Sequence, residues 1–231
     1  MSPNAEDVRA MFTRIAGRYD VMNAVMTGGR HRVWRDATAR ASVGAPPGPV
    51  LDLATGTCDL AIRIRELGRS RYVVGADFAD GMLAAGQRKL AGRGLTGVGL
   101  VGADALRLPF PDGVFACVTS AYLLRNLEDL ELGLREMRRV TRVGGLVATL
   151  DITRLTTPVW SWLFGVYFHR VVPLAGALVA GDRAAYTYLP RSVDRFVSAA
   201  ELADLMRRLG LRDVQYRTFG LGTVALHVAR V

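Results

Sequence analysis

Carboxylates accompany three short apolar runs in the first half of the chain. Asp52 lies within the run VLDLAT, Asp77 ends the run YVVGAD, and Asp104 ends the run VGLVGAD. The turn after the first run, ATGTCD, contains Gly56 but neither GxGxxG nor GK[ST], the sequences that cradle a diphosphate or a phosphate. Asp77 follows Gly56 by 21 residues, the separation expected of a carboxylate that accepts both hydroxyls of a ribose. The pattern therefore predicts a nucleoside site without a phosphate cradle.

A nucleoside held by carboxylates fits a ligand whose other end is positively charged. S-adenosylmethionine is the common ligand of this kind, because its sulfonium and amino groups favour nearby negative charge while its carboxylate can use free amides of the turn. We therefore predict S-adenosylmethionine as the cofactor, with a nicotinamide dinucleotide and a purely structural loop as alternatives. Asp52 also has a structural alternative, since an aspartate at a strand end often accepts bonds from adjacent backbone amides.

Apolar runs alternate with helical patterns through the middle of the chain. VLDLAT, YVVGAD, VGLVGAD, FACVTSA and LVATLDI are rich in β-branched residues and are predicted as strands. Helices are expected over CDLAIRIREL and over DGMLAAGQRKLAG, the second with Asp80 as its N-cap. A third helix, with apolar residues at 127, 130, 134, 137 and 140, is expected to stop at Gly144-Gly145. Repeated strand–helix–strand units predict a parallel sheet with helices on both faces.

The two ends of the chain follow other patterns. Residues 7–40 are predicted as helix, broken into two pieces at Gly28-Gly29. SAAE at 198–201 is a capping box that opens a helix expected to run to Gly210. VQYRTF and TVALHVAR flank a Gly-Leu-Gly turn and predict a closing antiparallel hairpin. Residues 153–197 show neither the strand–helix alternation of the middle of the chain nor the hairpin pattern of its end. They are interpreted as an apolar, aromatic insertion that covers the sheet.

Composition indicates one packed domain over residues 1–231, with N-terminal helices over about 1–43 and the cover over about 153–197. The hydrophobic content is 50% and the formal net charge is +9, which favours anionic partners. The basic residues are spread along the chain, so we do not predict a nucleic-acid partner. The two cysteines lack CxxC spacing and the histidines are not clustered, so no metal site is predicted. The low cysteine count favours a cytoplasmic location. The apolar stretch at 158–181 is interrupted by a His-Arg pair, so neither half reaches the roughly 20 residues of a membrane span.

Six segments, in order along the chain, carry a family resemblance. They are VRAMFTRIAGRYDVMNAVMTGGRHRVWR, LDLATGTCDL, LPFPDGVFA, LLRNLED, YTYLPRSVDRF and VALH. Together they resemble the ubiquinone/menaquinone biosynthesis C-methyltransferases, class I S-adenosylmethionine-dependent methyltransferases. The resemblance implies an α/β fold with a Rossmann-like, mostly parallel sheet, an antiparallel C-terminal hairpin, N-terminal helices and an inserted helical cover. It implies C-methylation of a prenylated quinol, in the first place demethylmenaquinol to menaquinol, or the equivalent benzoquinol of the ubiquinone pathway.

The same resemblance implies the cofactor contacts. Asp77 would hold the ribose, with Asp104 and Ala105 beside the adenine. The predicted set is Asp52, Gly56, Thr57, Asp77, Phe78, Asp104, Ala105 and Ser120. The chain departs from the family pattern at Cys58 (glycine in the family), Ala121 (a serine that contacts the cofactor) and Leu123 (glycine). Ser120 lies one position before the family serine, where strand alternation turns it to the other face. These departures bear on the quinol more than on the cofactor.

Methylation of a quinol carbon requires an adjacent hydroxyl to lose its proton, so a base or an electrostatic site for the phenolate is expected. We predict that Arg125 and Asn126 orient the ring oxygen, because arginine stabilises a phenolate without titrating. The alternative is that Arg125 pairs with Glu128 or Asp129. The candidates for accepting the proton, directly or through water, are Asp151, His169, Asp182, Tyr186 and Tyr188. Packing roles are the alternative for His169 and the tyrosines, and His31 and His227 are predicted to be structural.

Aromatic residues of the cover suggest where the tail binds. Trp160, Trp162, Phe164, Tyr167 and Phe168 are predicted to line a tunnel for a polyprenyl tail, with a core beneath a lid as the alternative. Peripheral contact with the inner face of the membrane would follow, and the cover could equally serve a homodimer. Two other functions stay open: methylation of another small phenolic or lipid-like metabolite, and non-catalytic binding of S-adenosylmethionine or nucleic acid. Nucleic-acid methylation is not expected, because no [ND]PP[YF] tetrapeptide follows the fourth strand.

Overall fold

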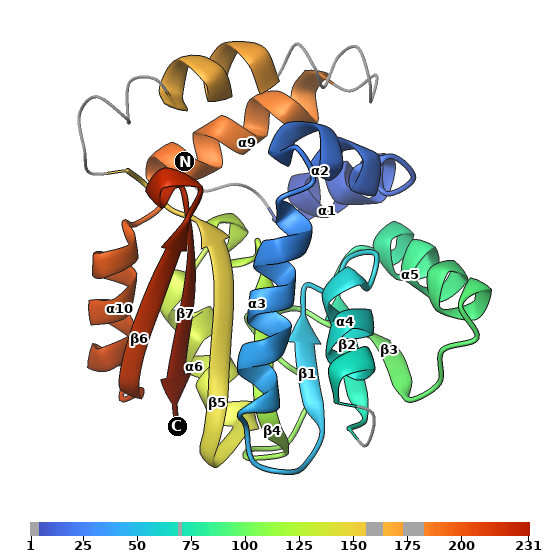
Figure 1. Ribbon diagram of the computed structural model, residues 1–231, viewed down its shortest axis with the longest axis vertical. Helices are drawn as coiled ribbons and strands as arrows, with labels where there is room; N and C mark the ends of the chain where they lie inside the picture. Colours follow the sequence, from blue (N-terminus) through green and yellow to red (C-terminus); the bar gives the residue numbers. More distant parts are fainter. Residues whose placement is uncertain (1–4, 69–70, 156–163, 173–182) are drawn as a thin grey trace.

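A seven-stranded sheet forms the centre of the molecule (Figure 1). The computed structural model describes residues 5–68, 71–155, 164–172 and 183–231. The strand order is β3-β2-β1-β4-β5-β7-β6, in which β1 to β5 are parallel and β7 runs antiparallel to both of its neighbours. The strands are β1 (Val50–Leu53), β2 (Val73–Asp77), β3 (Val98–Gly102), β4 (Phe115–Ala121), β5 (Thr141–Ile152), β6 (Arg212–Phe219) and β7 (Val224–Arg230). This confirms the predicted parallel sheet with its closing hairpin.

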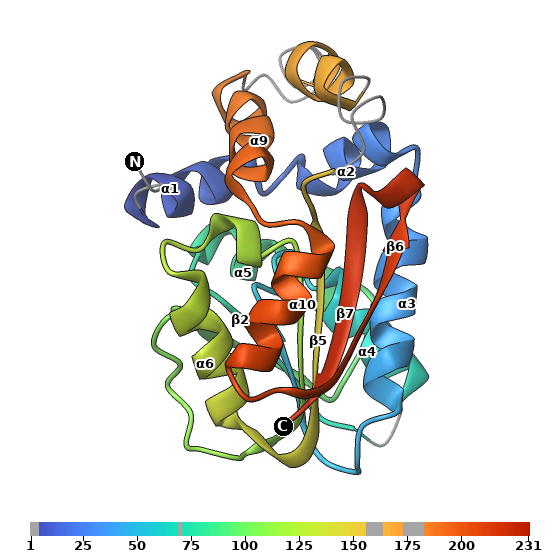
Figure 2. The same cartoon turned by 90° about the vertical axis from the view of Figure 1, so that its left-hand side faces the viewer.

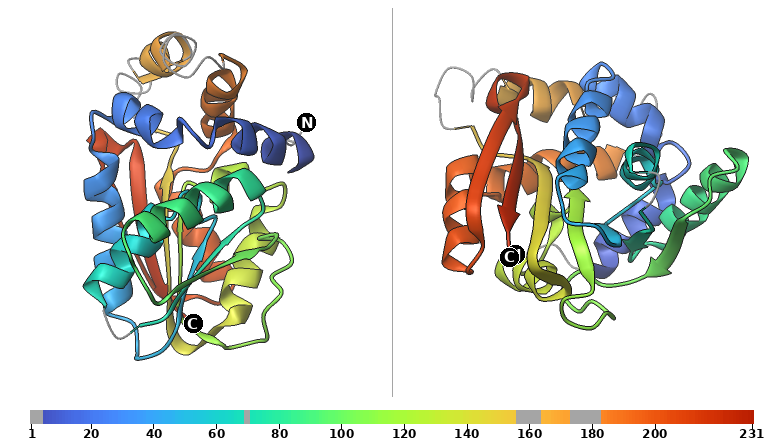
Figure 3. Two further views of the ribbon diagram at one scale, coloured as in Figure 1. Left: turned by 90° about the vertical axis from the view of Figure 1, so that its right-hand side faces the viewer. Right: turned by 60° about the horizontal axis from the view of Figure 1, so that its bottom comes forward.

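Helices cover both faces of the sheet (Figures 1 and 3). On one face α3 (His31–Val43), α4 (Asp59–Leu67) and α5 (Asp80–Gly92) pack through residues such as Ala39, Ile64 and Leu90. On the other face α6 (Leu130–Val140) and α10 (Ala199–Arg208) pack through Met137 and Met206. Burial of these apolar helix faces against β-branched strand residues is the main stabilising contribution of the core.

The carboxyl ends of the parallel strands are covered by further helical elements (Figure 2). α1 (Ala5–Ile15) and α2 (Tyr19–Thr27) lie over this edge beside η2 (Tyr167–Val171) and α9 (Arg183–Arg195). Met11, Met22, Met82, Phe168 and Val193 join these elements and α5 in one apolar cluster. Two short helical turns, η1 (Leu124–Asn126) and η4 (Gly220–Gly222), lie at the same end of the molecule.

The N-terminal helical region is divided more often than predicted. The expected break occurs at Gly28 and Gly29, whose φ angles of 55° and 77° are left-handed. A second break at residues 16–18 separates α1 from α2, so the region contains three helices rather than two. This break turns α1 toward α5, and Thr13 of α1 lies against Gly81.

Two predicted helix boundaries were wrong. Asp80 is the first helical residue of α5 and pairs with Arg9 of α1 at 2.6 Å, while Ala79 occupies the N-cap without a side-chain bond. The helix expected to stop at Gly144 ends at Val140, because the Thr141 backbone is extended and its hydroxyl donates to the Met137 carbonyl. The glycine pair therefore lies inside β5. The capping box at Ser198 and Glu201 is confirmed, and that helix ends at Arg208, two residues before Gly210.

Candidate functional site

A cavity of about 120 Å³, here called the strand-tip cavity, lies at the carboxyl ends of β1, β2 and β4. Five of the eight predicted cofactor contacts line it: Gly56, Asp77, Phe78, Asp104 and Ala105. They come together because parallel strands present their carboxyl ends at one edge of the sheet. Every charged residue among the described lining is acidic, namely Asp77, Asp104 and Glu128. The cavity therefore suits a ligand that carries positive charge and no phosphates.

Asp77 is held rigidly at this edge. It is 5% exposed, its Oδ2 accepts from the Gly56 amide at 2.8 Å, and its Oδ1 accepts from the Ala79 amide at 2.9 Å. Burial raises the pKa of Asp77, and these two backbone bonds oppose the rise. An ionised carboxylate has about four acceptor positions, so each oxygen can accept one further hydrogen bond. This arrangement can accept two hydroxyls of a ribose.

Three predicted cofactor contacts lie elsewhere. Asp52 is 1% exposed and accepts from the hydroxyls of Thr55 and Thr119, at 2.7 and 3.0 Å, and burial raises the pKa of Asp52 to about 6. Thr57 is also buried and donates to Asp20 at 2.7 Å. Ser120 is fully buried, and its hydroxyl has no hydrogen-bond partner among the described residues. None of the three lines the strand-tip cavity.

The three residues that depart from the family pattern lie in two different places. Ala121 and Leu123 line the strand-tip cavity. Cys58 is fully buried against α5, where its Sγ lies 2.3 Å from the position that a Cβ on Gly86 would take. Burial raises the pKa of the Cys58 thiol to about 12, so this thiol stays protonated and acts as a small apolar group. Of the three changes, only those at Ala121 and Leu123 alter a cavity wall.

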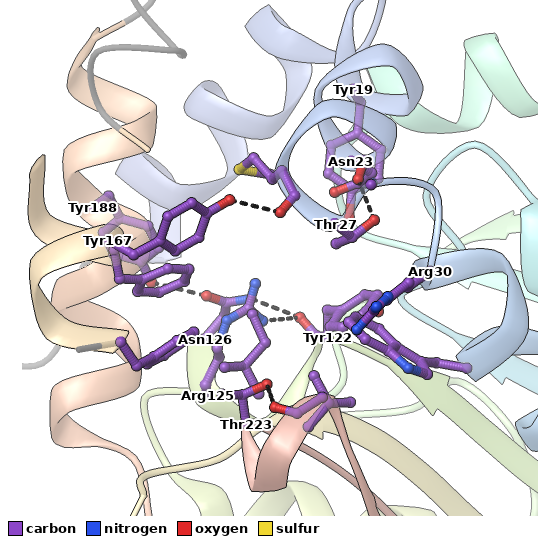
Figure 4. A pocket seen from close by; sticks show the side chains of 18 of the residues that line it. Tyr19, Asn23, Thr27, Arg30, Tyr122, Arg125, Asn126, Tyr167, Tyr188 and Thr223 are labelled. Carbon is purple, nitrogen blue, oxygen red and sulfur yellow. Dashed lines mark hydrogen bonds between the residues drawn. The ribbon is translucent and has the colours of Figure 1, made fainter. Parts of the chain in front are cut away.

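A second cavity, of about 610 Å³, adjoins the first and is here called the apolar cavity (Figure 4). α1, α2, η2, α9 and η4 enclose it, and most of its lining is apolar or aromatic. Phe164, Tyr167 and Phe168 of the predicted tunnel are on its wall, whereas Trp160 and Trp162 lie outside the described residues. Besides Tyr167, the polar and charged side chains on the wall are Tyr19, Asn23, Thr27, Arg30, Tyr122, Arg125, Asn126, Tyr188 and Thr223.

Four residues line both cavities: Phe12, Tyr19, Tyr122 and Asn126. A nucleoside ligand in one cavity and an apolar ligand in the other would therefore meet at these side chains. Phe12, Tyr19 and Tyr122 were not among the site residues predicted from the sequence. Tyr19, Asn23, Met26 and Thr27 recur at helical spacing on one face of α2, which is the signal that could have indicated the α2 wall.

Arg125 presents a buried cation to the apolar cavity. Its Nη1 lies 3.2 Å from Asp151 Oδ1 and donates to the Tyr122 carbonyl at 2.6 Å. Of the two partners considered from sequence, Asp129 instead caps α6 by accepting from the Leu132 amide, and Glu128 lines the strand-tip cavity. Asp151 does not line the apolar cavity, and its carboxylate also accepts from the backbone amides of Arg125 and Ile152. Asp151 is therefore the counter-ion of Arg125 rather than a base in contact with a ligand.

Asn126 is fixed by bonds at both ends of its amide. Its Nδ2 donates to the Tyr122 carbonyl at 2.8 Å, and its Oδ1 accepts from the Tyr188 hydroxyl at 3.2 Å. Burial raises the pKa of Tyr188, which keeps the hydroxyl protonated as a donor. The Tyr122 backbone that anchors both η1 side chains has a left-handed φ of 66°. This strained conformation directs its carbonyl toward Arg125 and Asn126.

The structure does not describe the side chains of the remaining proton-acceptor candidates, and it shows structural contacts for the other two histidines. The side chains of His169 and Tyr186, and the whole of Asp182, lie outside the described residues. His31 Nδ1 is 2.8 Å from the Thr27 hydroxyl, and burial lowers the pKa of His31 to about 4. His227 Nε2 is 2.8 Å from the Ala199 carbonyl, and the ring stacks on Tyr216. Both histidines thus have the structural contacts predicted for them.

The sequence matches known proteins along its length. Residues 1–230 match the sequence model of the ubiE/COQ5 methyltransferase family. A demethylmenaquinone methyltransferase of Roseiflexus castenholzii is 44% identical over 225 residues, which cover 96% of this chain and 92% of that protein. The ubiquinone/menaquinone biosynthesis C-methyltransferase UbiE of Desulfotalea psychrophila is 41% identical over 220 residues, covering 95% of this chain and 88% of that protein.

Solved structures of similar shape have more distant sequences. The [4+2]-cyclase SpnF superimposes with a TM-score of 0.74 at 17% identity, covering 99% of this chain and 97% of that chain. A S-adenosylmethionine-dependent methyltransferase from Thermotoga maritima gives a TM-score of 0.65 at 16% identity, covering 96% of this chain and 98% of that chain. At these identities the likeness concerns the fold alone, and it confirms the predicted class I methyltransferase architecture.

Proposed function

The chain belongs to the ubiE/COQ5 methyltransferase family, and from this premise we propose that it methylates a ring carbon of a prenylated quinol, in the first place demethylmenaquinol. S-adenosylmethionine is its cofactor. One observation carries the proposal: a cavity with acidic lining residues adjoins an apolar cavity. The two share the lining residues Phe12, Tyr19, Tyr122 and Asn126. A benzoquinol of the ubiquinone pathway is the second acceptor to test, because the relative from Desulfotalea psychrophila is named for both quinones.

The strand-tip cavity fits S-adenosylmethionine in charge and in hydrogen bonding. Asp77 would hold the ribose, Phe78 and Ala105 would flank the adenine, and Asp104 would lie beside it. The acidic lining favours a cationic ligand over a dinucleotide, whose phosphates it would repel. When bound, S-adenosylmethionine supplies a methyl group on a positively charged sulfur. Alignment of the two ligands and exclusion of water are then the tasks of the protein.

Arg125 would promote loss of the quinol proton. Among the described residues, no carboxylate or imidazole lines the apolar cavity. A guanidinium beside the ring hydroxyl lowers the pKa of that hydroxyl by stabilising the phenolate, and the proton can then pass to water. Asn126, fixed by Tyr122 and Tyr188, would orient the same oxygen. We therefore assign the activation of the carbon to charge stabilisation rather than to a protein base in direct contact.

Peripheral binding of a cytoplasmic enzyme to the inner face of the membrane would supply the prenylated acceptor. Leu221 of η4 is 71% exposed and lines the apolar cavity, as do Tyr167, which is 37% exposed, and Arg30. An exposed apolar side chain beside a cation suits the boundary between lipid headgroups and acyl chains. Within the part of the chain that the structure describes, no helix combines the length and the apolar content needed to cross a bilayer.

A flotation assay tests this membrane contact. We expect the protein to float with vesicles that contain anionic lipid, and Leu221→Asp to reduce the bound fraction several-fold. Val143→Asp is the matched control, because Val143 is 91% exposed near the start of β5, whereas Ile152 at the other end of that strand lines the apolar cavity. Equal binding by the two variants, or no flotation of the wild type, would argue against the proposed contact. A dimer through the cover would show instead as a doubled mass in sedimentation without lipid.

The activity itself is tested with labelled cofactor and a panel of acceptors under reducing conditions. We expect turnover of demethylated naphthoquinol, slower or absent turnover of benzoquinol, and a loss of at least a hundredfold in kcat for Arg125→Gln. Calorimetry of the same variant should show unchanged cofactor affinity, which separates loss of chemistry from loss of fold. If the protein methylates a different phenolic acceptor and neither quinol, the quinol assignment is wrong and the alternative function, methylation of another small metabolite, is supported.

A further inference from the structure

Asn23 of α2 is a buried polar side chain whose bonding is incomplete. It is 9% exposed, it lines the apolar cavity, and its Nδ2 has no hydrogen-bond partner among the described residues. Its backbone carbonyl accepts from the Thr27 hydroxyl at 2.6 Å, which ties the residue to the next turn of α2. A buried N–H group without a partner typically destabilises the folded protein, so Asn23 is best explained by a ligand.

Three other polar residues of the apolar cavity already have partners. The Thr27 hydroxyl donates to Asn23 and lies 2.8 Å from His31 Nδ1. The Thr223 hydroxyl donates to the Gly220 carbonyl, and Tyr167 donates to the Met26 carbonyl. Asn23 differs from these three in having a donor left for a molecule in the cavity, and it shares this property with Tyr122 Oη and Arg125 Nε, which line the cavity opposite α2 and also lack a partner among the described residues. The terminal torsion of asparagine is broad, so its amide can turn toward a ligand oxygen at small cost.

Asn23 and Arg125 lie on opposite walls of the apolar cavity. Figure 4 shows Asn23 on the α2 wall, across the open space from Arg125 and Asn126. A quinol ring carries two hydroxyls at para positions, which point to opposite sides of the ring. We propose that Asn23 binds the second quinol oxygen, para to the one that Arg125 orients. This inference rests on the proposed function and adds a positioning residue on the opposite wall.

Binding at both oxygens would fix the orientation of the ring in its plane. With only Arg125 and Asn126 engaged, the ring could pivot about one oxygen and carry the reacting carbon out of line with the cofactor. A contact at the para oxygen removes that freedom, because two points of attachment define one in-plane orientation. Asn23 would therefore distinguish dihydroxy acceptors from phenols that have a single hydroxyl.

The test pairs two variants with two ligands. The ligands are demethylated naphthoquinol and its analogue that lacks the para hydroxyl, with KM measured for the first and an inhibition constant for the second. For Asn23→Leu we expect the KM of the quinol to rise about tenfold, and the inhibition constant of the analogue to change less than twofold. Val21→Ala, on α2 but 55% exposed and outside the lining of both cavities, is the control and should leave both constants within twofold of wild type. Cofactor affinity and thermal melting confirm that each variant is folded, and Asn23→Ala provides a smaller replacement if the leucine disturbs packing.

The outcomes separate this inference from the proposed function. Equal weakening of both ligands by the Asn23 variants, or no weakening of either, would overturn the role of Asn23 while leaving quinol methylation intact. A wild-type protein that binds cofactor but does not turn over the quinol would contradict the proposed function itself. A tenfold effect confined to the dihydroxy ligand would support the contact.

Discussion

Arg125 Nη1 and Asp151 Oδ1 lie 3.2 Å apart in an ion pair whose side chains are only 6% and 1% exposed. The pairing of β4 with β5 brings them together, since Arg125 follows β4 and Asp151 lies near the end of β5. Burial raises the pKa of Asp151, and the neighbouring guanidinium opposes that rise. The Arg125 guanidinium can therefore lie on the wall of the apolar cavity because its counter-ion, Asp151, is buried behind that wall.

Removing the charge of Asp151 should destabilise the fold. Asp151→Asn leaves the Arg125 guanidinium buried without a counter-ion, a change expected to lower the free energy of unfolding by about 3–5 kcal/mol. Urea denaturation measures this quantity. Arg154→Ala is the control, because it breaks an exposed pair with Glu201 and should change the unfolding free energy by less than about 1 kcal/mol. Similar denaturation midpoints for the two variants would contradict the role assigned to the buried pair.

Loss of the Asp77 carboxylate should weaken cofactor binding. Hydrogen bonds to a charged group contribute about 1.5–3 kcal/mol each, so we expect Asp77→Ala to raise the dissociation constant ten- to a hundredfold. Asp77→Asn retains one acceptor and should give an intermediate value. Isothermal titration calorimetry provides the measurement, with Asp80→Ala as a control three residues away on the exposed surface of α5. An unchanged dissociation constant for Asp77→Ala would show that Asp77 does not bind the ribose.

The parts of the site that follow directly from chain order could be predicted from the sequence. Asp77 and Asp104 come after β-branched runs, and parallel strands that share an edge bring such residues together without further information. The capping box at Ser198 was equally local, because both of its partners lie within one turn of α10. The capping box was therefore predicted correctly, because both of its hydrogen bonds are local.

The rest depended on contacts between distant segments. Asp52 and Thr57 flank the same turn as Gly56, yet their side chains bond to Thr119 and Asp20, which no spacing rule connects to them. Aspartate is a preferred N-cap residue, so Asp80 was predicted as the N-cap of α5. Its carboxylate instead forms an ion pair with Arg9 of α1. The helical spacing of Asn23 with Tyr19 and Thr27 marks one face of α2, but only the closure of α2 over the sheet makes that face a cavity wall.

Asp52 should make stability depend on pH. Its pKa of about 6 in the folded protein lies above the ordinary value of about 3.9, so the native state binds the proton more tightly than the unfolded chain. Its contribution to stability is therefore greatest below about pH 4 and falls as the pH rises to about 6. Arg35 opposes this effect by favouring the carboxylate.

Asp52→Asn tests that dependence, because asparagine cannot ionise. We expect the unfolding free energy of the variant to rise relative to wild type between pH 4 and pH 7, by about 3 kcal/mol at most. Urea denaturation at several pH values gives the difference directly. A constant difference between the two proteins across this range would show that Asp52 does not titrate in it.

Lys89 links the N-terminal helices to the helices around the strand-tip cavity, and it is the only lysine in the sequence. Its Nζ donates to Asp20 of α2 at 2.5 Å, to Asp59 of α4 at 2.7 Å and to the Thr57 hydroxyl at 3.1 Å. Asp59 also accepts from Arg35 of α3 at 2.6 Å. One ammonium group on α5 thus connects α2, which lines both cavities, to the turn that begins α4.

Replacing Lys89 should loosen this connection. Lys89→Met leaves Asp20 and Asp59 close together without the cation between them, so we expect the unfolding free energy to fall by about 1–3 kcal/mol and cofactor affinity to weaken several-fold. Asp80→Ala, which breaks the exposed Arg9–Asp80 pair between α1 and α5, should change either quantity little. Because Lys89 is the single lysine, its acylation by an amine reagent can be followed by peptide mass, and Asp20→Asn should accelerate it. Equal acylation rates in wild type and Asp20→Asn would mean that the ammonium group is not held by Asp20 in solution.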